Sequence, residues 1–431
     1  MLREEGVLRE ESGTCEEGGS REESGSGEEG GTCEEGRSCE EGSGEEGGQE
    51  VKRKRFDKPH RAHGFDWPVR LCFQDMAENN PQIAASVVVP CWNVERYARR
   101  ALDEIAASAD ICGEKIEIVA VDDGSGDATA EILEEAATRD PRVKFLRRPH
   151  RGVSAARNAA LDAASGEYVF FVDPDDGVDP AFFKEMLSAI RSSRADACVC
   201  AMADRGGEAT PLKARYDFKS RDEILAGYLP RIFGYSFDDI RAWYAGRPLF
   251  QNREMASACR FVFKRSLIEE SRIRFDESVE LFEDMLFVAE CLVRANSMAS
   301  IDRALYLVTP RSEGAMATIL GDRSRTCANK SRLLAGRRRI DGISGGRLAP
   351  LYEGTCVLSA LEIGSWILRG GMPRKAALAA FADYLREPEV RSALKRFPLS
   401  AKKPLVAAAV AATRMVSLLL RPRSLTSRER R

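Results

Sequence analysis

Three carboxylates end an apolar run in the stretch FVDPDDG at residues 171–177. Asp173, Asp175 and Asp176 carry like charges that repel one another at this spacing. Three interpretations are open: a solvated turn, a calcium loop, or one wall of a site for a metal ion and a phosphate group. A calcium loop of the helix-loop-helix type needs glycine at its sixth position and glutamate at its twelfth. Counted from Asp173, glycine is fifth and Lys184 is twelfth, which excludes the calcium loop.

Pro174 helps to choose between the two remaining interpretations. The residue before a proline is biased toward extended backbone, so Asp173 should continue the preceding strand. Asp173 and Asp175 should then project together, and a divalent cation would relieve their repulsion. Mg²⁺ and Mn²⁺ prefer hard oxygen ligands and are commonly shared with substrate phosphates. The spacing therefore favours a site for Mg²⁺ or Mn²⁺, with a solvated turn as the alternative on these residues alone.

Strand and helix patterns alternate from residue 83 onward, and polar clusters follow the strands. The expected strands are 86–90, 116–121, 143–148 and 167–172, and the expected helices are 94–107, 127–140 and 154–166. Single helices between strands imply crossover connections and a mostly parallel sheet. Ligands of such sheets bind beyond the carboxyl ends of the strands. The sequences CWN, DDGSGD and DPDD stand at three of those ends, which predicts a shared crevice.

Four segments occur in one order at close spacing: VVVPCWNVERY, IVAVDDGSGDAT, RGVSAARNAAL and EYVFFVDPDDG. Together they resemble the family 2 glycosyltransferases, which transfer a sugar from a nucleoside-diphosphate donor. The resemblance is close over residues 86–186 and continues more weakly to about residue 312. It implies an α/β fold of the GT-A type, with a Rossmann-like, mostly parallel sheet flanked by helices. A C-terminal helical region is expected in addition.

The resemblance implies a nucleotide pocket formed in part by the loop after the first strand. Pro90, Trp92, Asn93 and Glu95 match this loop, although Cys91 and Trp92 stand where small or aromatic residues are usual.

Two further segments complete the expected nucleotide site. Asp122 and Asp123 match an acidic pair that contacts the base and the ribose, and a carboxylate accepts hydrogen bonds from base N–H groups and from hydroxyls. Arg157 and Asn158 match a GxxxARN segment, in which Arg157 would lie near the nucleotide. A surface position on a helix is the alternative for Arg157.

The reacting groups are also implied by the resemblance. Asp173 and Asp175 match the DxD element, expected to hold the ribose and the metal, and a metal there would offset charge on the departing diphosphate. In FEDMLF, Glu283 and Asp284 resemble the ED element, in which Asp284 aligns with the base that deprotonates the acceptor hydroxyl and Glu283 belongs to the substrate site. The apolar neighbours of Asp284 predict that its side chain is partly buried, and burial raises the pKa of a carboxyl group. An acidic first turn favoured by the helix dipole is the alternative.

The implied activity is that of an inverting, metal-dependent glycosyltransferase acting in cell-surface polysaccharide or glycan biosynthesis. No QxxRW sequence follows the ED element, which argues against a processive synthase. The expected partners are a nucleoside-diphosphate sugar and a glycan or lipid-linked acceptor, and no nucleic acid is expected. The alternatives are a nucleotidyltransferase-like enzyme, which would normally carry a glycine-rich phosphate loop after the first strand, and a non-catalytic nucleotide-sugar-binding module.

Composition divides the chain of 431 residues into segments, and its 43% hydrophobic content can supply a proper core. Residues 1–50 carry 17 Glu and 4 Arg, a net charge of −13, which leaves about +10 for the remainder. With almost no large apolar side chains, this Glu/Gly/Ser-rich segment is expected to be disordered. A basic linker at 51–82 should precede a donor-binding half at 83–200, an acceptor-binding half at 201–320, and a helical region at 321–431.

The expected location is the cytoplasm, with peripheral contact at the inner face of the plasma membrane. Twelve cysteines are too sparse for a disulfide scaffold and mostly lie in apolar runs, as buried thiols of a reducing compartment do. The apolar segment 404–420 is interrupted by Arg414 and is too short and broken to predict a membrane span. An interfacial amphipathic helix followed by a basic tail and a packed terminal helix both fit it.

Overall fold

The computed structural model describes residues 83–249, 252–310, 319–369, 373–397, 409–414 and 416. All of these lie in one compact unit, Asn79–Arg431. The expected disordered segment 1–50 and the basic linker 51–82 lie outside the described residues. The same holds for most of the segment 404–420 and for the basic tail.

The described chain alternates strands and helices in its first half and becomes helical toward its end. The strands are β1 Ala85–Cys91, β2 Ile116–Asp122, β3 Val143–Arg147, β4 Tyr168–Phe171, β5 Gly177–Val178, β6 Ala197–Asp204, β7 Ala209–Thr210, β8 Asp217–Phe218, β9 Phe261–Lys264 and β10 Met298–Val308. The helices before the last strand are α1 Glu95–Cys112, α2 Thr129–Arg139, α3 Val153–Ala163, α4 Phe182–Ser193, α5 Arg221–Gly227, α6 Leu229–Ile232, α7 Phe237–Tyr244, the short 3₁₀ turn η1 Ala258–Arg260, α8 Arg265–Glu270 and α9 Glu283–Arg294. They are followed by α11 Arg323–Ser344, α12 Ala349–Arg369, α13 Arg374–Arg386 and α14 Pro388–Arg396.

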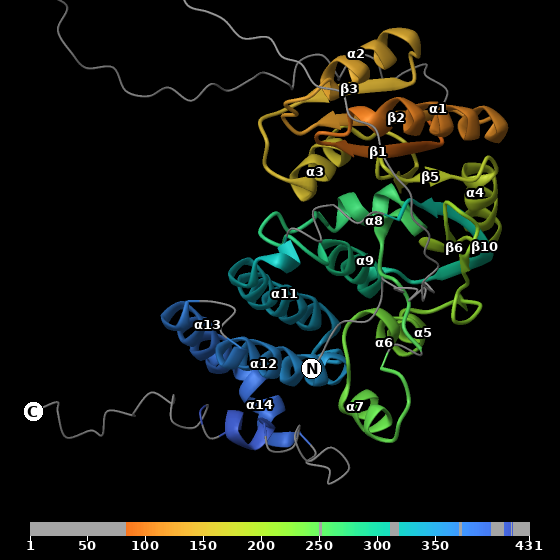
Figure 1. Ribbon diagram of the computed structural model, residues 1–431. Coiled ribbons are helices and arrows are strands. Elements are labelled where there is room, and N and C mark those ends of the chain that lie inside the picture. Colours follow the sequence, from red (N-terminus) through yellow and green to blue (C-terminus); the bar gives the residue numbers. More distant parts are fainter. Residues whose placement is uncertain are drawn as a thin grey trace, which may run out of the picture. The chain divides into compact units, whose positions relative to one another are not determined.

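One sheet joins the strands in the order β3-β2-β1-β4-β9-β6-β10-β5, with β7 paired to β6 and β8 to β10. The strands β3, β2 and β1 lie in this order near the top of Figure 1. The strands β3, β2, β1 and β4 run parallel, as the crossover helices require. The predicted positions of these four strands and of α1 to α3 are confirmed to within a few residues, apart from the end of α1. The strand β9 enters antiparallel between β4 and β6, so the sheet is continuous across residue 200.

Helices cover the sheet because its central strands are apolar on both faces. Every residue of β1 and of β2 is buried, which matches the continuous apolar runs typical of parallel strands. The helix α3 packs on β1 and β2, and α4 packs on β6 and β10. The carboxyl ends of β1, β2 and β4 therefore meet at one edge, where their polar clusters follow.

The C-terminal helices form a second layer of packing against the helix that carries Asp284. Helix α11 packs on α9, and α12, α13 and α14 pack against one another. None of the helices in the described ranges is long and apolar enough to cross a membrane. Of the segment 404–420, Val410 is buried, and Arg414 donates hydrogen bonds to the carbonyls of Leu394 and Phe397. The described part of this segment thus packs against the end of α14.

A buried carboxylate ties the amino ends of the strands together. Glu117 accepts hydrogen bonds from the Ser86 hydroxyl at 2.5 Å and from the Ser165 backbone N–H at 2.6 Å. Its other oxygen forms an ion pair with Lys144 Nζ at 2.6 Å. The Gly166 N–H donates to the Ser86 hydroxyl at 2.8 Å, which brings the entrance of β4 directly against β1.

The close approach at Gly166 leaves no room for a side chain. A Cβ atom there would lie 2.5 Å from the Ser86 backbone nitrogen. We expect Gly166→Ala to lower the free energy of unfolding by about 1–3 kcal/mol, the usual cost of overpacking. Gly342→Ala in α11 is the matched control, because a Cβ there meets nothing within 4 Å and alanine is the better helix former. Urea unfolding of both variants checks this, and equal stabilities would contradict the close approach.

Candidate active site

A buried arginine joins the carboxylates that the sequence singled out. Arg157 in α3 has a side chain that is only 3% exposed. Its guanidinium contacts Asp173 at 2.8 Å, Asp284 at 2.8 Å and Glu283 at 3.1 Å. The structure thus brings together four predicted site residues from α3, the end of β4 and the start of α9. The surface position considered for Arg157 is wrong, because its side chain is buried.

The cluster lies on an aromatic floor and carries an excess of negative charge. The Arg157 guanidinium lies 5.1 Å from the centroid of the Phe275 ring, which stacks on Phe287 at 4.0 Å. The Nε atom of Arg157 is buried and has no hydrogen-bond partner among the described residues. One guanidinium cannot neutralise three carboxylates, so two formal negative charges remain when all three are ionised. Apolar surroundings strengthen each of these interactions relative to water.

Burial shifts the ionisation of both carboxyls of the ED element. The side chain of Glu283 is 13% exposed and that of Asp284 is 17% exposed. Burial, reinforced by the charge of Asp284, raises the pKa of Glu283 to about 7, although Arg157 opposes the shift. Burial also raises the pKa of Asp284, with Arg157 opposing and Asp173 reinforcing the shift. The cluster therefore retains a proton closer to neutral pH than free carboxyl groups would.

The Asp284 carboxylate is also held from a second chain segment, which the sequence did not reveal. Its Oδ2 atom accepts hydrogen bonds from the Ala258 N–H at 3.0 Å and from the Ser257 hydroxyl at 3.3 Å. Arg260, 1% exposed, fixes this segment by donating to the Met255 carbonyl at 2.9 Å. The sequence next to a buried arginine does not indicate its partners, so the sequence pattern could not have identified Arg260.

A second stabilising contact for this segment is the buried ion pair of Arg260 with Glu254. The two side chains are 1% and 2% exposed and their charged atoms lie 3.4 Å apart. Glu254 also accepts hydrogen bonds from the Tyr216 hydroxyl and the Lys213 N–H, both at 2.6 Å. Removing one partner of such a pair would leave a buried charge uncompensated.

The entry to α9 has an unusual backbone conformation. Phe282, directly before Glu283, has a φ of 63°, a left-handed conformation that costs a bulky residue ~1–3 kcal/mol. The side chain of Asn329 in α11 holds the preceding residues, accepting from the Glu280 N–H at 2.8 Å and donating to the Leu281 carbonyl at 3.0 Å. Contacts from another helix therefore impose the turn that presents the ED element, and no short-range sequence signal indicates them.

The three carboxylates of DPDD have different surroundings. Asp176 is 8% exposed, and its two oxygens accept from the Tyr306 hydroxyl and the Thr309 N–H, both at 2.8 Å. Burial, reinforced by the charge of Asp173, raises the pKa of Asp176 to about 6. Asp173 is 31% exposed and Asp175 is half-buried. Asp176 thus supports the turn, whereas Asp173 and Asp175 are the accessible carboxylates.

Asp173 and Asp175 fit a metal ion that is shared with a substrate better than one that is enclosed by protein. Across the described ranges, no group of three or more His, Cys, Asp and Glu side chains could hold a metal ion. Mg²⁺ commonly binds through one or two carboxylates together with phosphate oxygens of the substrate. Two accessible carboxylates separated by one residue are compatible with that arrangement, and Asp173 and Asp175 are the residues that would hold it.

The acidic pair after β2 is buried and shapes the neighbouring loops. Asp123 accepts hydrogen bonds from the Gly152 N–H at 2.7 Å and the Arg151 N–H at 3.1 Å, and its Oδ2 lies 2.9 Å from His150 Nδ1. Asp122 accepts from the Ser125 N–H at 3.0 Å. In this structure both carboxylates organise loop backbone, and the predicted contacts with base and ribose remain predictions.

The loop after β1 places one aromatic ring at the surface. Trp92 is 49% exposed and stacks on His150 at 4.4 Å with an interplanar angle of 23°. Asn93 accepts from the Gly126 N–H at 2.9 Å, and Glu95 accepts from the Ala128 N–H at 3.0 Å. Pro90 is buried within β1. Trp92 is thus an exposed aromatic ring of this loop, and the sequence pattern gave no indication of its partner His150.

Asn158 has a structural part in positioning the aromatic floor. Its amide nitrogen donates to the Phe275 carbonyl at 3.0 Å, and its amide oxygen accepts from the Phe275 N–H at 2.8 Å. This reciprocal pair fixes the backbone of the residue that lies beneath Arg157. The predicted substrate contact of Asn158 remains a prediction.

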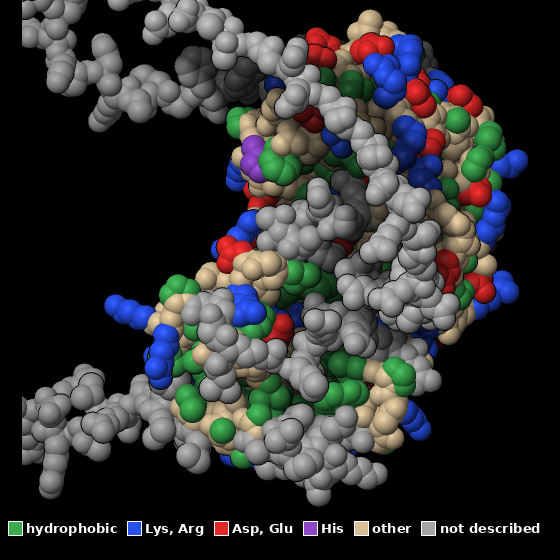
Figure 2. All heavy atoms as spheres, viewed as in Figure 1, with side chains coloured by type: hydrophobic (Ala, Val, Ile, Leu, Met, Phe, Trp, Pro, Cys, Tyr) green, Lys and Arg blue, Asp and Glu red, His purple; other side chains and the backbone are tan. Residues whose placement is uncertain are grey.

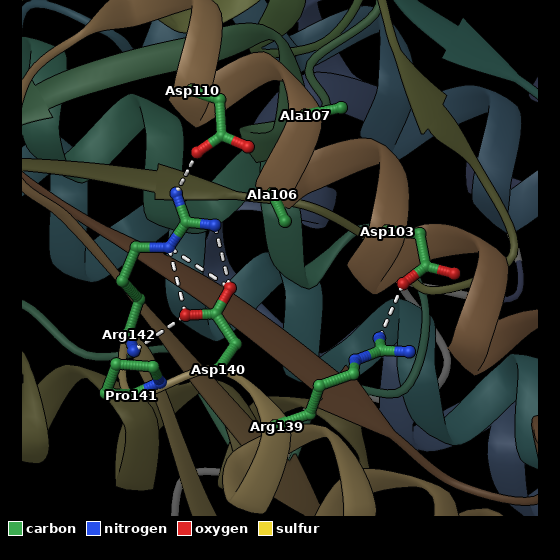
Figure 3. A pocket seen from close by; sticks show the side chains of 8 residues that line it. All are labelled: Asp103, Ala106, Ala107, Asp110, Arg139, Asp140, Pro141 and Arg142. Carbon is green, nitrogen blue, oxygen red and sulfur yellow. Dashed lines mark hydrogen bonds and ion pairs between the residues drawn. The ribbon is translucent and has the colours of Figure 1, made fainter.

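A surface hollow elsewhere has no part in this site. It is lined by Asp103, Ala106, Ala107, Asp110, Arg139, Asp140, Pro141 and Arg142 (Figure 3). Ion pairs Arg139–Asp103 and Arg142–Asp110, both at 2.6 Å, cross it from α1 to the end of α2 and to the turn that follows α2. Acidic and basic side chains are interspersed on the face that Figure 2 shows in the region of α1 and α2. The hollow lies at the amino end of β3, away from the polar clusters.

Comparison with known proteins finds a family that resembles part of the chain. Residues 86–270 match the model of the glycosyl transferase family 2. This part of the chain is similar to a family 2 glycosyltransferase domain. It contains most of the clusters described here, and the ED element follows it along the chain. The GT-A type of fold is also seen in the solved structure of Staphylococcus aureus TarS in complex with UDP-GlcNAc. The two structures superpose with a TM-score of 0.52 at 20% sequence identity, over 78% of this chain and 91% of the TarS chain.

Curated relatives match about half of the chain. The glycosyltransferase EpsJ of Bacillus subtilis, described as uncharacterized, is 26% identical over 52% of this chain and 60% of EpsJ. The succinoglycan biosynthesis protein ExoO of Rhizobium meliloti is 29% identical over 54% of this chain and 62% of ExoO. The chain thus matches less than two thirds of the length of these relatives.

The raised pKa of Glu283 predicts a pH-dependent stability difference. The pKa is about 7 in the folded protein against an ordinary value of 4.5. Between these two values ionisation favours the unfolded chain, so the contribution of Glu283 falls as pH rises. We expect Glu283→Gln, which cannot ionise, to gain ~1–3 kcal/mol relative to wild type between about pH 5 and about pH 8.

Urea unfolding of both proteins at the two pH values measures this gain. Glu134→Gln is the control, because Glu134 is exposed on α2, away from the cluster. A difference that is equal at both pH values would show that Glu283 ionises as an ordinary carboxyl group.

Proposed function

We propose that the protein is an inverting, metal-dependent glycosyltransferase that moves a sugar from a nucleoside-diphosphate sugar to an acceptor hydroxyl. The observation that carries this proposal is the single cluster in which Arg157 contacts Asp173 and Asp284. Asp173, which we assign to the donor, and Asp284, which we assign to the acceptor, are far apart in the sequence but contact the same guanidinium. The family 2 domain supports the same reaction class.

The donor binds at the carboxyl ends of β1, β2 and β4. Trp92 provides an aromatic surface for the base, and the loops organised by Asp122 and Asp123 surround the nucleotide. Asp173 and Asp175 would hold a divalent cation, which when bound would offset the charge that develops on the diphosphate. The TarS neighbour was solved with UDP-GlcNAc, which supports a nucleotide-sugar donor of this type.

Asp284 takes the proton from the acceptor hydroxyl. A carboxylate offers about four lone-pair sites, and three of those on Asp284 are occupied by Arg157, Ala258 and Ser257. The remaining site accepts the hydroxyl proton while the acceptor oxygen attacks the anomeric carbon. The bond from that carbon to the diphosphate oxygen breaks on the opposite side, so one displacement inverts the configuration. The raised pKa of the carboxyl makes it a stronger base than a free aspartate.

The setting we infer is a single sugar addition in cell-surface polysaccharide or glycan biosynthesis. The name of the relative ExoO refers to succinoglycan biosynthesis, which supports this class of product. The acceptor is a glycan or a lipid-linked precursor, met in the cytoplasm or at the inner face of the plasma membrane.

Replacing the base tests the chemical step. We expect Asp284→Asn to lower sugar transfer by about 10²–10⁴-fold, the usual contribution of a general base. The amide can still accept from the Ala258 N–H, so the fold and donor binding should persist. Single-turnover assays with UDP-GlcNAc, UDP-glucose, UDP-galactose and GDP-mannose measure transfer and hydrolysis. A variant as active as wild type would assign the base elsewhere.

Replacing one carboxylate of the proposed cation site tests donor binding. We expect UDP with Mn²⁺ to raise the Tm of the wild type, and Asp175→Ala to abolish the Mn²⁺-dependent part of that rise, because the ion loses one of its two protein ligands. Asp110→Ala, in the hollow of Figure 3, is the matched control and should respond as wild type. If neither UDP nor GDP shifts the Tm, or if Asp175→Ala responds fully, this metal assignment fails.

A further inference from the structure

Two exposed apolar side chains lie on the two chain segments that hold the Asp284 carboxylate. Phe282 is 49% exposed and stands two residues before Asp284. Met255 is 53% exposed and stands two residues before Ser257, whose hydroxyl donates to Asp284. The reaction described above leaves both side chains without a role.

The fold gains little from the Phe282 ring. Within the described residues, the ring belongs neither to the hydrophobic core nor to the side chains packed against it. Its backbone φ of 63° is one that glycine adopts without strain and that a bulky residue does not. An aromatic residue that is strained, exposed and unpacked beside a base is better explained by a ligand contact than by stability.

The backbone beneath both side chains is fixed, although the side chains themselves are exposed. The Phe282 carbonyl accepts from the Leu286 N–H at 3.4 Å, and the preceding residue is held by Asn329. The Met255 carbonyl accepts from Arg260 at 2.9 Å. Rigid presentation of an exposed apolar group lowers the entropy lost when a ligand binds.

We propose that Phe282 and Met255 form the acceptor subsite, in which the C–H face of a neutral sugar ring lies against the Phe282 ring and its hydroxyl reaches Asp284. This inference rests on the proposed glycosyl transfer. A sugar ring combines an apolar face with hydroxyls at its edge, which matches an aromatic ring next to a carboxylate. The carboxyl groups of Glu283 and Asp284, which lie next to this subsite, disfavour an anionic unit at the same place.

The test separates acceptor binding from folding by using glycine at position 282. We expect Phe282→Gly to raise the KM for an acceptor sugar about tenfold with kcat within about twofold, because the contact of a phenyl ring is lost. Its Tm should equal or exceed that of wild type, since glycine relieves the positive φ. Phe282→Trp should keep the wild-type KM. Ile111→Ala, which removes another half-exposed apolar side chain on α1, is the matched control and should change neither.

The probes are methyl glycosides of glucose, galactose and N-acetylglucosamine, with glycerol phosphate as the anionic comparison, in the donor assay described above. An unchanged KM in Phe282→Gly overturns the subsite, as does a fall of kcat together with Tm, which would show that the ring serves the fold. Preferred transfer to glycerol phosphate overturns the neutral acceptor. A wild-type protein that consumes no donor refutes the proposed function and this inference with it, whereas transfer with an unaffected variant refutes only the inference.

Discussion

The charge balance around Arg157 is the constraint on which the rest of the site depends. A buried guanidinium that lost its counterions would cost several kcal/mol, and so would the carboxylates if they lost the guanidinium. Helix α3, the end of β4 and the start of α9 must therefore keep their relative positions. Burial, reinforced by the same negative charge that demands the arginine, raises the pKa of Glu283 to about 7. Burial of the charged cluster thus governs both the stability of the site and its readiness to exchange a proton.

The surrounding structure limits how this cluster can relax. The Phe275 ring beneath the guanidinium is fixed at its backbone by Asn158 and at its face by Phe287. From the other side, the Ser257 hydroxyl and the Ala258 N–H, in the segment that Arg260 fixes, donate hydrogen bonds to Asp284. Preorganised donors of this kind do not have to reorient when charge moves during a reaction. The carboxylate is consequently held in place before any substrate arrives.

The sequence predicted the parts of the fold that depend on local pattern. The strands β1, β2, β3 and β4 follow from apolar runs, and the residues after them follow from motif spacing. The position of β9 did not follow, because pairing between β4 and β6 is decided by contacts distant in the chain. Arg260 and the left-handed Phe282 were missed for the same reason, since the forces that hold them come from other segments. The motif around Asp284 located the residue, but only the structure showed that Ser257 and Ala258 hold it.

The acidic residues of this site illustrate how surroundings assign different tasks to one chemical group. Asp123 and Asp176 have their oxygens occupied by donors of the protein and are almost fully buried, so they hold loops in place. Asp173, 31% exposed, shares one guanidinium but still faces solvent. Asp284 has most of its lone pairs occupied and one left over, which is the condition that a proton acceptor needs. Counting donors around each carboxylate therefore separates the groups that build the site from those that can react in it, a distinction that the repeated letter D in the sequence does not show.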